Sequence, residues 1–65
     1  MNNKKIADKL KEIRGKYSRN YMASFLGVSV SAIQMYENGE RIPRDETKLK
    51  YAEFAKESVD SIFFT

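Results

Sequence analysis

The strongest constraint on how this chain folds is the pattern of apolar and small residues between residues 19 and 38. Met22 and Leu26 lie one helical turn apart, so they face the same side of a short helix. Gly27 can adopt the positive φ needed just past the end of that helix, and Ser29 is a favourable N-cap for a second helix. The window therefore predicts two short helices joined by a tight turn that contains glycine.

The sequence also indicates how these two helices meet. Ala23 is small at the place where the second helix must approach the backbone closely, and Val28 fills the corner beneath the turn. Ile33 and Tyr36 form the inner edge of the second helix. Two helices joined by a three-residue turn in this way make a helix-turn-helix, here at about residues 18–38.

The rest of the chain predicts further helices, because no segment alternates in polarity with a period of two. Boundaries follow from N-cap residues, glycines and the one proline. We expect an all-α fold of five helices, at residues 4–14, 19–26, 30–37, about 45–55 and just after residue 58. The predicted core consists of the inward positions of these helices: Ile6, Leu10, Ile13, Met22, Ala23, Leu26, Val28, Ile33, Tyr36, Leu49, Ala52, Val59 and Ile62.

Composition argues against an enzyme and against a membrane protein. The chain has no Cys, His or Trp, which removes disulfides, thiolate or imidazole metal ligands and the commonest general base. No run approaches the roughly 20 apolar residues of a membrane span, and the polar residues 1–5 lack the apolar core of a secretory signal. We therefore expect one complete domain over residues 1–65, cytoplasmic, with no cofactor, no metal and no small-molecule ligand.

Positive charge is concentrated in the first third of the chain. Residues 1–19 hold seven Lys and Arg against two acids, whereas residues 20–65 hold five against seven acids. Such an asymmetry suits a polyanionic partner, although a solvated helix face would give the same count.

Successive residues placed 100° apart divide the helix at residues 30–37 into two faces. Ala32, Ile33 and Tyr36 fall on the inner face. The outer face suits the major groove of DNA, where apolar side chains contact thymine methyls, Ser serves several bases and Gln pairs with adenine. Ordinary exposure of apolar residues is the alternative explanation. The residues of this outer face are Val30, Ser31, Gln34, Met35 and Asn38.

Several segments match one known family: Ser18, residues 22–29, residues 31–33, residues 36–43 and residues 58–64. Through them the chain resembles the Cro and phage-repressor (XRE-like) helix-turn-helix DNA-binding proteins. The resemblance implies a compact, lambda-repressor-like fold whose second and third helices bind DNA. The chain most resembles small family members from temperate phages and mobile elements of Gram-positive bacteria, which implies a nucleoid-associated protein of a bacterial or phage-infected cell.

The resemblance also implies roles for individual residues around the groove. Base contacts are implied for Val30, Ser31, Gln34 and Met35, and phosphate contacts for Lys16, Ser18, Arg19, Asn38 and Arg41. Arg19 stands where many members carry Gln, and a guanidinium can keep the phosphate contact with added charge.

Arg14 and Glu37 match an ion pair that joins the first helix to the recognition helix in this family. If the two were unpaired surface charges instead, either could be removed at little cost to stability.

The expected function is sequence-specific transcriptional regulation, by a repressor that binds a two-fold operator in double-stranded DNA as a homodimer, which can form on the DNA itself. Phe54, Phe63 and Phe64 are the expected dimer interface. Phe54 lies off the inward stripe of its helix, and a short helix can direct only one of the adjacent Phe63 and Phe64 fully into its own core. The alternative is an antitoxin-like protein-interaction module with secondary DNA binding.

Overall fold

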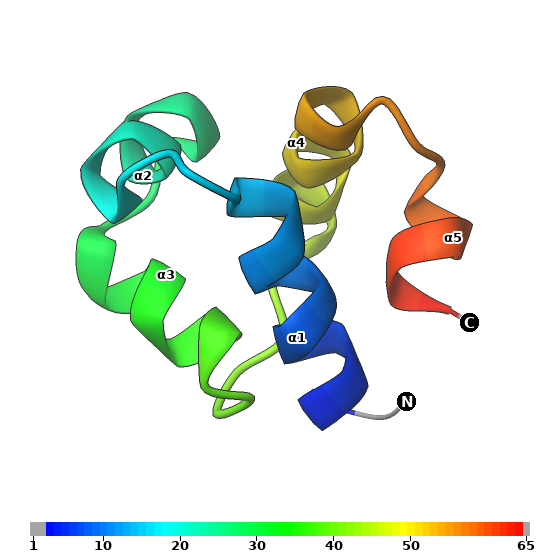
Figure 1. Cartoon of the computed structure of the whole chain (residues 1–65). Helices are drawn as coiled ribbons and strands as arrows, with labels where there is room; N and C mark the ends of the chain where they lie inside the picture. Colours follow the sequence, from blue (N-terminus) through cyan, green and yellow to red (C-terminus); the bar gives the residue numbers. More distant parts are fainter. Residues whose placement is uncertain (1–2, 65) are drawn as a thin grey trace.

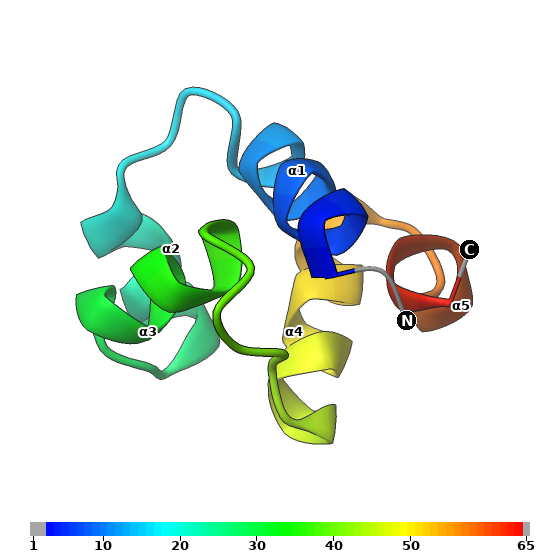
Figure 2. The ribbon, with the colours of Figure 1, turned by 90° about the horizontal axis from the view of Figure 1, so that it is seen from below.

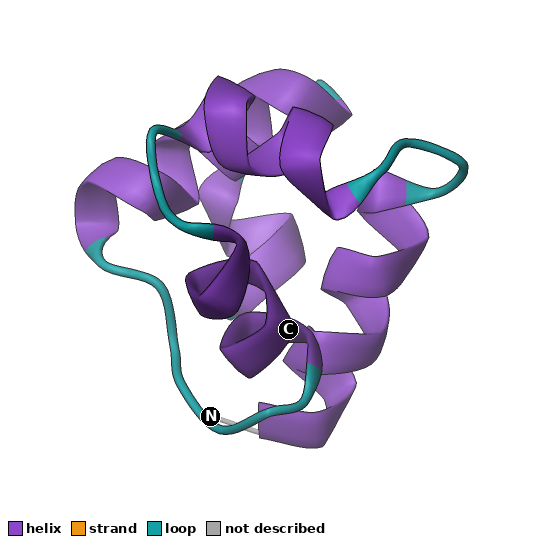
Figure 3. Ribbon diagram, turned by 90° about the vertical axis from the view of Figure 1, so that its left-hand side faces the viewer, coloured by secondary structure: helices purple, strands orange, loops and turns teal. Residues whose placement is uncertain are grey.

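The computed structural model describes residues 3–64, and they form five helices joined by short loops, with no strand in this range (Figure 3). The expected all-α class is confirmed. None of these helices is long and apolar enough to cross a membrane. The helices are α1 (Asn3–Arg14), α2 (Arg19–Leu26), α3 (Val30–Glu37), α4 (Asp45–Ala55) and α5 (Val59–Phe63).

Serine hydroxyls and glycines set the helix boundaries. Ser18, Ser29 and Ser58 directly precede α2, α3 and α5, and each hydroxyl accepts a hydrogen bond from the N–H of the third residue of its helix, at 3.0 to 3.1 Å. Gly27 ends α2 with a φ of 72°, and its N–H donates to the carbonyl of Ala23. These caps leave only three residues between α2 and α3, and this fixes the angle at which the two helices meet.

The helices are arranged around a central pair. α1 and α4 form the middle of the molecule, with α2 and α3 on one side and α5 on the other (Figures 1 and 2). α2 and α3 cross at a steep angle and pack closely on each other, and α3 also packs on α1. One long face of α3 is therefore left towards the outside of the molecule.

The core lies where all five helices meet. Ile13, Val28, Ala52 and Val59 are half-buried against it, so twelve of the predicted core positions lie in or on the core. The buried residues of the core are Ile6, Leu10, Met22, Ala23, Leu26, Ala32, Ile33, Tyr36, Tyr51, Ile62 and Phe63.

α4 turns a different face inward from the one predicted. The placement of Leu49 in the core was wrong, because its side chain is 60% exposed while Tyr51 is fully buried. Tyr51 packs edge-on against Tyr36 and Phe63, with ring centroids 6.3 Å apart in both pairs. A large aromatic ring fills the space between three helices better than leucine can, and this decides which face of α4 is buried.

We predict that the Tyr51 hydroxyl makes stability sensitive to alkaline pH. Burial, together with the charge of Glu37, raises the pKa of Tyr51 above its ordinary value of 10.0. Because the folded-state pKa is the higher one, the free energy of unfolding falls as pH rises above about 10, where the unfolded chain ionises first. The hydroxyl also has no hydrogen-bond partner among residues 3–64.

Tyr51→Phe should therefore leave the free energy of unfolding at neutral pH unchanged or raise it by about 1 kcal/mol. It should also weaken the alkaline decline, measured by urea denaturation at about pH 7 and about pH 11. Tyr21→Phe, at an exposed position, is the matched control. An alkaline decline in Tyr51→Phe as steep as in the unmodified protein would contradict this account.

Candidate nucleic-acid interface

A buried carboxylate at the end of α3 ties the three N-terminal helices together. Arg14 donates two hydrogen bonds to Glu37, from Nε to Oε2 at 2.7 Å and from Nη2 to Oε1 at 3.0 Å. Its third nitrogen, Nη1, donates to the backbone carbonyl of Tyr17 at 2.8 Å. The ion pair expected from the family resemblance is thus present, and its hydrogen bonds raise the pKa of Arg14 above its ordinary value.

Arg19 shares the same carboxylate. Its Nε donates to Oε1 of Glu37 at 3.3 Å, and its side chain is more exposed than that of Arg14. Two guanidinium groups around one carboxylate leave one positive charge uncompensated, on the side where Arg19 reaches solvent. Sequence reasoning considered only an outward role for Arg19 and missed this contact, because nothing in the spacing of residues 19 and 37 indicates that they meet.

The outer face of α3 carries the side chains predicted to contact bases. Val30, Ser31 and Gln34 are exposed, while Met35 is half-buried at the edge of this face. The opposite face is held in the core by the three residues expected there: Ala32, Ile33 and Tyr36.

Polar and cationic groups lie in the loops on either side of the α2–α3 pair. Lys16 and Arg41 are exposed, and neither forms an ion pair with another residue in the described part of the chain. Ser18 uses its oxygen to cap α2, but its hydroxyl proton stays free to donate outward. Asn38 is exposed and donates from Nδ2 to the Glu40 carboxylate at 3.2 Å, so an acid lies beside this expected phosphate contact.

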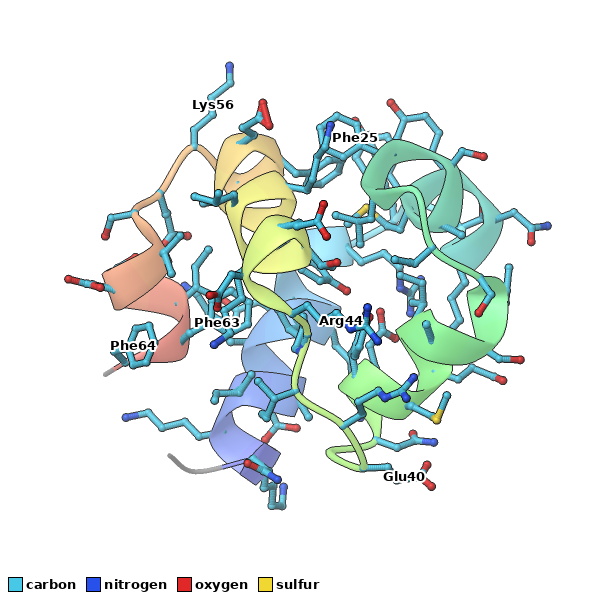
Figure 4. The ribbon with its side chains drawn as sticks, turned by 180° about the vertical axis from the view of Figure 1, so that it is seen from behind. Phe25, Glu40, Arg44, Lys56, Phe63 and Phe64 are labelled. Carbon is cyan, nitrogen blue, oxygen red and sulfur yellow. The ribbon has the colours of Figure 1, made fainter. Side chains whose placement is uncertain are left out.

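Arg44 is a cation that the sequence reasoning did not assign. It directly precedes α4, and its side chain points towards the α3 side of the molecule (Figure 4). Together with Arg41 and Lys50 it lines a pocket of about 350 Å³ beside the turn between α2 and α3. The signal that could have identified it is the close spacing of two arginines, residues 41 and 44, around the one proline.

The three phenylalanines expected at a dimer interface do not lie together. The assignment of Phe63 was wrong, because its ring is buried in the core beside Tyr51. Phe54 packs against aromatic side chains of α2 and of the loop before it. Phe64 is 57% exposed at the end of α5 and remains available to a partner (Figure 4).

A comparison with known protein families matches residues 5–62 to a helix-turn-helix family. The match contains the whole of α2, α3 and α4 and most of α1 and α5. No curated protein and no solved structure gives a significant match to this chain.

We predict that the two arginines around Glu37 differ in what they contribute to stability. Arg14→Ala removes the two short hydrogen bonds to a buried carboxylate and should lower the free energy of unfolding by about 3 kcal/mol. Arg19→Ala removes one longer, more exposed contact and should cost about 1 kcal/mol. Urea denaturation of both variants measures the difference, and equal losses would show that Arg14 does not dominate the cluster.

Proposed function

Because the chain belongs to the Cro and phage-repressor (XRE-like) helix-turn-helix family of DNA-binding transcriptional regulators, we propose that it reads specific DNA sequences with α3 in the major groove. The observation that carries this proposal is the outer face of α3. Val30, Ser31 and Gln34 are exposed there although the other face of the same helix is packed in the core. A helix held on one side and open on the other can enter a groove without unfolding its own packing.

The side chains of this face suit an A/T-rich operator. The amide of Gln34 can accept from and donate to adenine, and the hydroxyl of Ser31 can bond to several bases. Val30 and Met35 offer no hydrogen bonds, so their contribution is contact with thymine methyl groups. Because two of the four proposed base-contacting side chains are apolar, sequence-dependent DNA shape contributes the rest of the discrimination between operators.

Phosphate contacts on both sides of α3 would position it. Arg19 suits one of them, because its hydrogen bond to Glu37 limits its rotamers while leaving part of the guanidinium towards solvent. Lys16 and Ser18 precede it, in the loop between α1 and α2. Arg41 and Asn38 would contact the backbone on the other side, and for Asn38 this requires that the Glu40 carboxylate turn away from the phosphate.

We propose that the protein binds as a homodimer and represses transcription by occupying its operator. One described subunit measures 27 × 23 × 21 Å, whereas successive major-groove half-sites on one side of DNA lie about 34 Å apart. Reading both half-sites therefore takes two copies. Phe64 is the proposed contact between them, because its ring is exposed on one side and covered by the Lys48 ammonium, 5.1 Å from its centroid, on another.

Selection of bound sequences from a random double-stranded DNA pool tests the proposal and should return a two-fold symmetric, A/T-rich site. On that site, Gln34→Ala should change the preference at one base position by about 1 to 3 kcal/mol. Arg41→Ala should instead weaken binding to all DNA sequences alike and reduce the salt dependence of the affinity. For about six phosphates neutralised by the dimer, log K should fall with log salt with a slope near −5.

Glu53→Ala, on the exposed side of α4, is the control that should leave affinity unchanged. A selection that returns no sequence preference, or a base preference that changes in Arg41→Ala and not in Gln34→Ala, would contradict the placement of α3 in the groove.

The dimer contact is tested by Phe64→Glu, which should keep the fold and the melting temperature but weaken operator binding, because a charge replaces apolar area between subunits. Sedimentation on and off the selected DNA measures the stoichiometry. Tyr21→Glu changes a similarly exposed aromatic residue on α2 and is the matched control. Unchanged operator binding by Phe64→Glu would locate the interface elsewhere.

A further inference from the structure

An exposed cluster of aromatic rings lies where the end of α4 meets α2. Tyr17, Tyr21 and Phe25 are 43%, 51% and 39% exposed, and Phe54 is half-buried beneath them. Tyr17 stacks on Tyr21 with ring centroids 4.9 Å apart. Phe54 meets all three other rings edge-on, at 5.3 to 6.4 Å. We call these four residues the aromatic patch.

Phe54 packs against the core, but neither the core nor the proposed DNA contacts explain the three exposed rings of the aromatic patch. Tyr21 and Phe25 lie four residues apart on α2, and Tyr17, four residues earlier in the loop before α2, extends this row, while the inward face of α2 is filled by other residues that are buried. Figure 4 shows Phe25 between α2 and the end of α4 that carries Lys56, away from the turn with Glu40 that follows α3. Contiguous exposed aromatic surface of this kind marks interaction sites.

The charge around the aromatic patch favours an acidic partner. Lys50 lies one turn before Phe54 on the same side of α4, Lys56 follows two residues after it, and both are exposed. Neither lysine forms an ion pair with another residue among 3–64. Glu53 lies about 100° around α4 from Phe54 and so faces a different direction. The border on the α4 side is therefore positive.

This charge also distinguishes between possible occupants. A second copy docked by two-fold symmetry would bring the same lysines towards each other, which like-charge repulsion opposes. Single-stranded nucleic acid binds by stacking successive bases on ring faces, but Tyr17 and Tyr21 already cover one face of each other and Phe54 is half-buried beneath them, which leaves few faces for bases. An acidic protein segment would be attracted by the lysines and does not need stacked bases to bind the rings.

We propose that the aromatic patch is the docking site for an acidic segment of a partner protein that carries apolar side chains. The apolar side chains would pack on Tyr21 and Phe25, and the carboxylates would pair with Lys50 and Lys56. The site lies outside the face of α3, so partner binding and base reading use separate surfaces of one small domain. This goes beyond DNA binding and does not depend on it.

The test is selection from a phage-displayed library of random peptides on the immobilised protein, with counter-selection on the double variant Tyr21→Ser/Phe25→Ser. The enriched peptides should be rich in Asp and Glu and in Phe, Leu or Trp. As a soluble synthetic peptide, the dominant sequence should bind the unmodified protein at least tenfold more tightly than the double variant. Circular dichroism and melting temperature show whether the variant is folded.

Two further variants separate the contributions of apolar contact and charge. Lys50→Glu/Lys56→Glu should lower the affinity for the peptide about tenfold, which corresponds to a loss of about 1.4 kcal/mol in binding free energy. Leu49→Ser, which removes another exposed apolar side chain of α4, should leave peptide affinity unchanged. Amide chemical shifts should change in residues 17–25 and 50–56 of the unmodified protein.

Three results would overturn the proposal. One is a selection that enriches nothing over the double variant, or that enriches basic or uncharged peptides. Another is self-association of the unmodified protein that the double variant abolishes, which would assign the aromatic patch to a second copy. The third is tight binding of oligothymidylate that Tyr21→Ser/Phe25→Ser abolishes, which would assign it to single-stranded nucleic acid.

Discussion

The bidentate ion pair between Arg14 and Glu37 is the interaction on which the arrangement of α3 depends. α3 has eight residues, too few to be stable in isolation. Its last residue is a buried carboxylate at the negative end of the helix dipole, which is unfavourable without cations. Arg14 from α1 and Arg19 from α2 supply them. The requirement to satisfy Glu37 thereby fixes α3 relative to both neighbouring helices.

The same cluster connects stability to the proposed function. Glu37 neutralises one of its two arginines, and the remaining positive charge lies at the more exposed Arg19, at the start of α2. A phosphate contact made there would be positioned by the same carboxylate that orients α3. The outer face of α3 and the proposed backbone contact are therefore held in a fixed relation by one group, before any DNA is bound.

Local rules predicted the helices well because their signals are local. Ser18, Ser29 and Gly27 act within four residues of their own positions, and the two faces of α3 follow from helical spacing alone. The inward face of α4 could not be predicted in this way. Leu49 and Tyr51 both offered apolar surface, and the choice between them depends on Tyr36 and Phe63, which are distant in sequence. The aromatic patch was missed for the same reason, since Phe54 is 29 or more residues from its partners in the chain.

The central claim is that the exposed face of α3 lies in the major groove, and cleavage of DNA by an iron chelate attached to a single cysteine tests it most directly. The chain has no cysteine, so Gln34→Cys carries the chelate at one defined position. On the operator selected from the random pool, this conjugate should cut inside each half-site, whereas a conjugate at Lys56→Cys, at the far end of α4, should not. Cleavage from position 56 and none from position 34, with both variants bound to the DNA, would contradict the account.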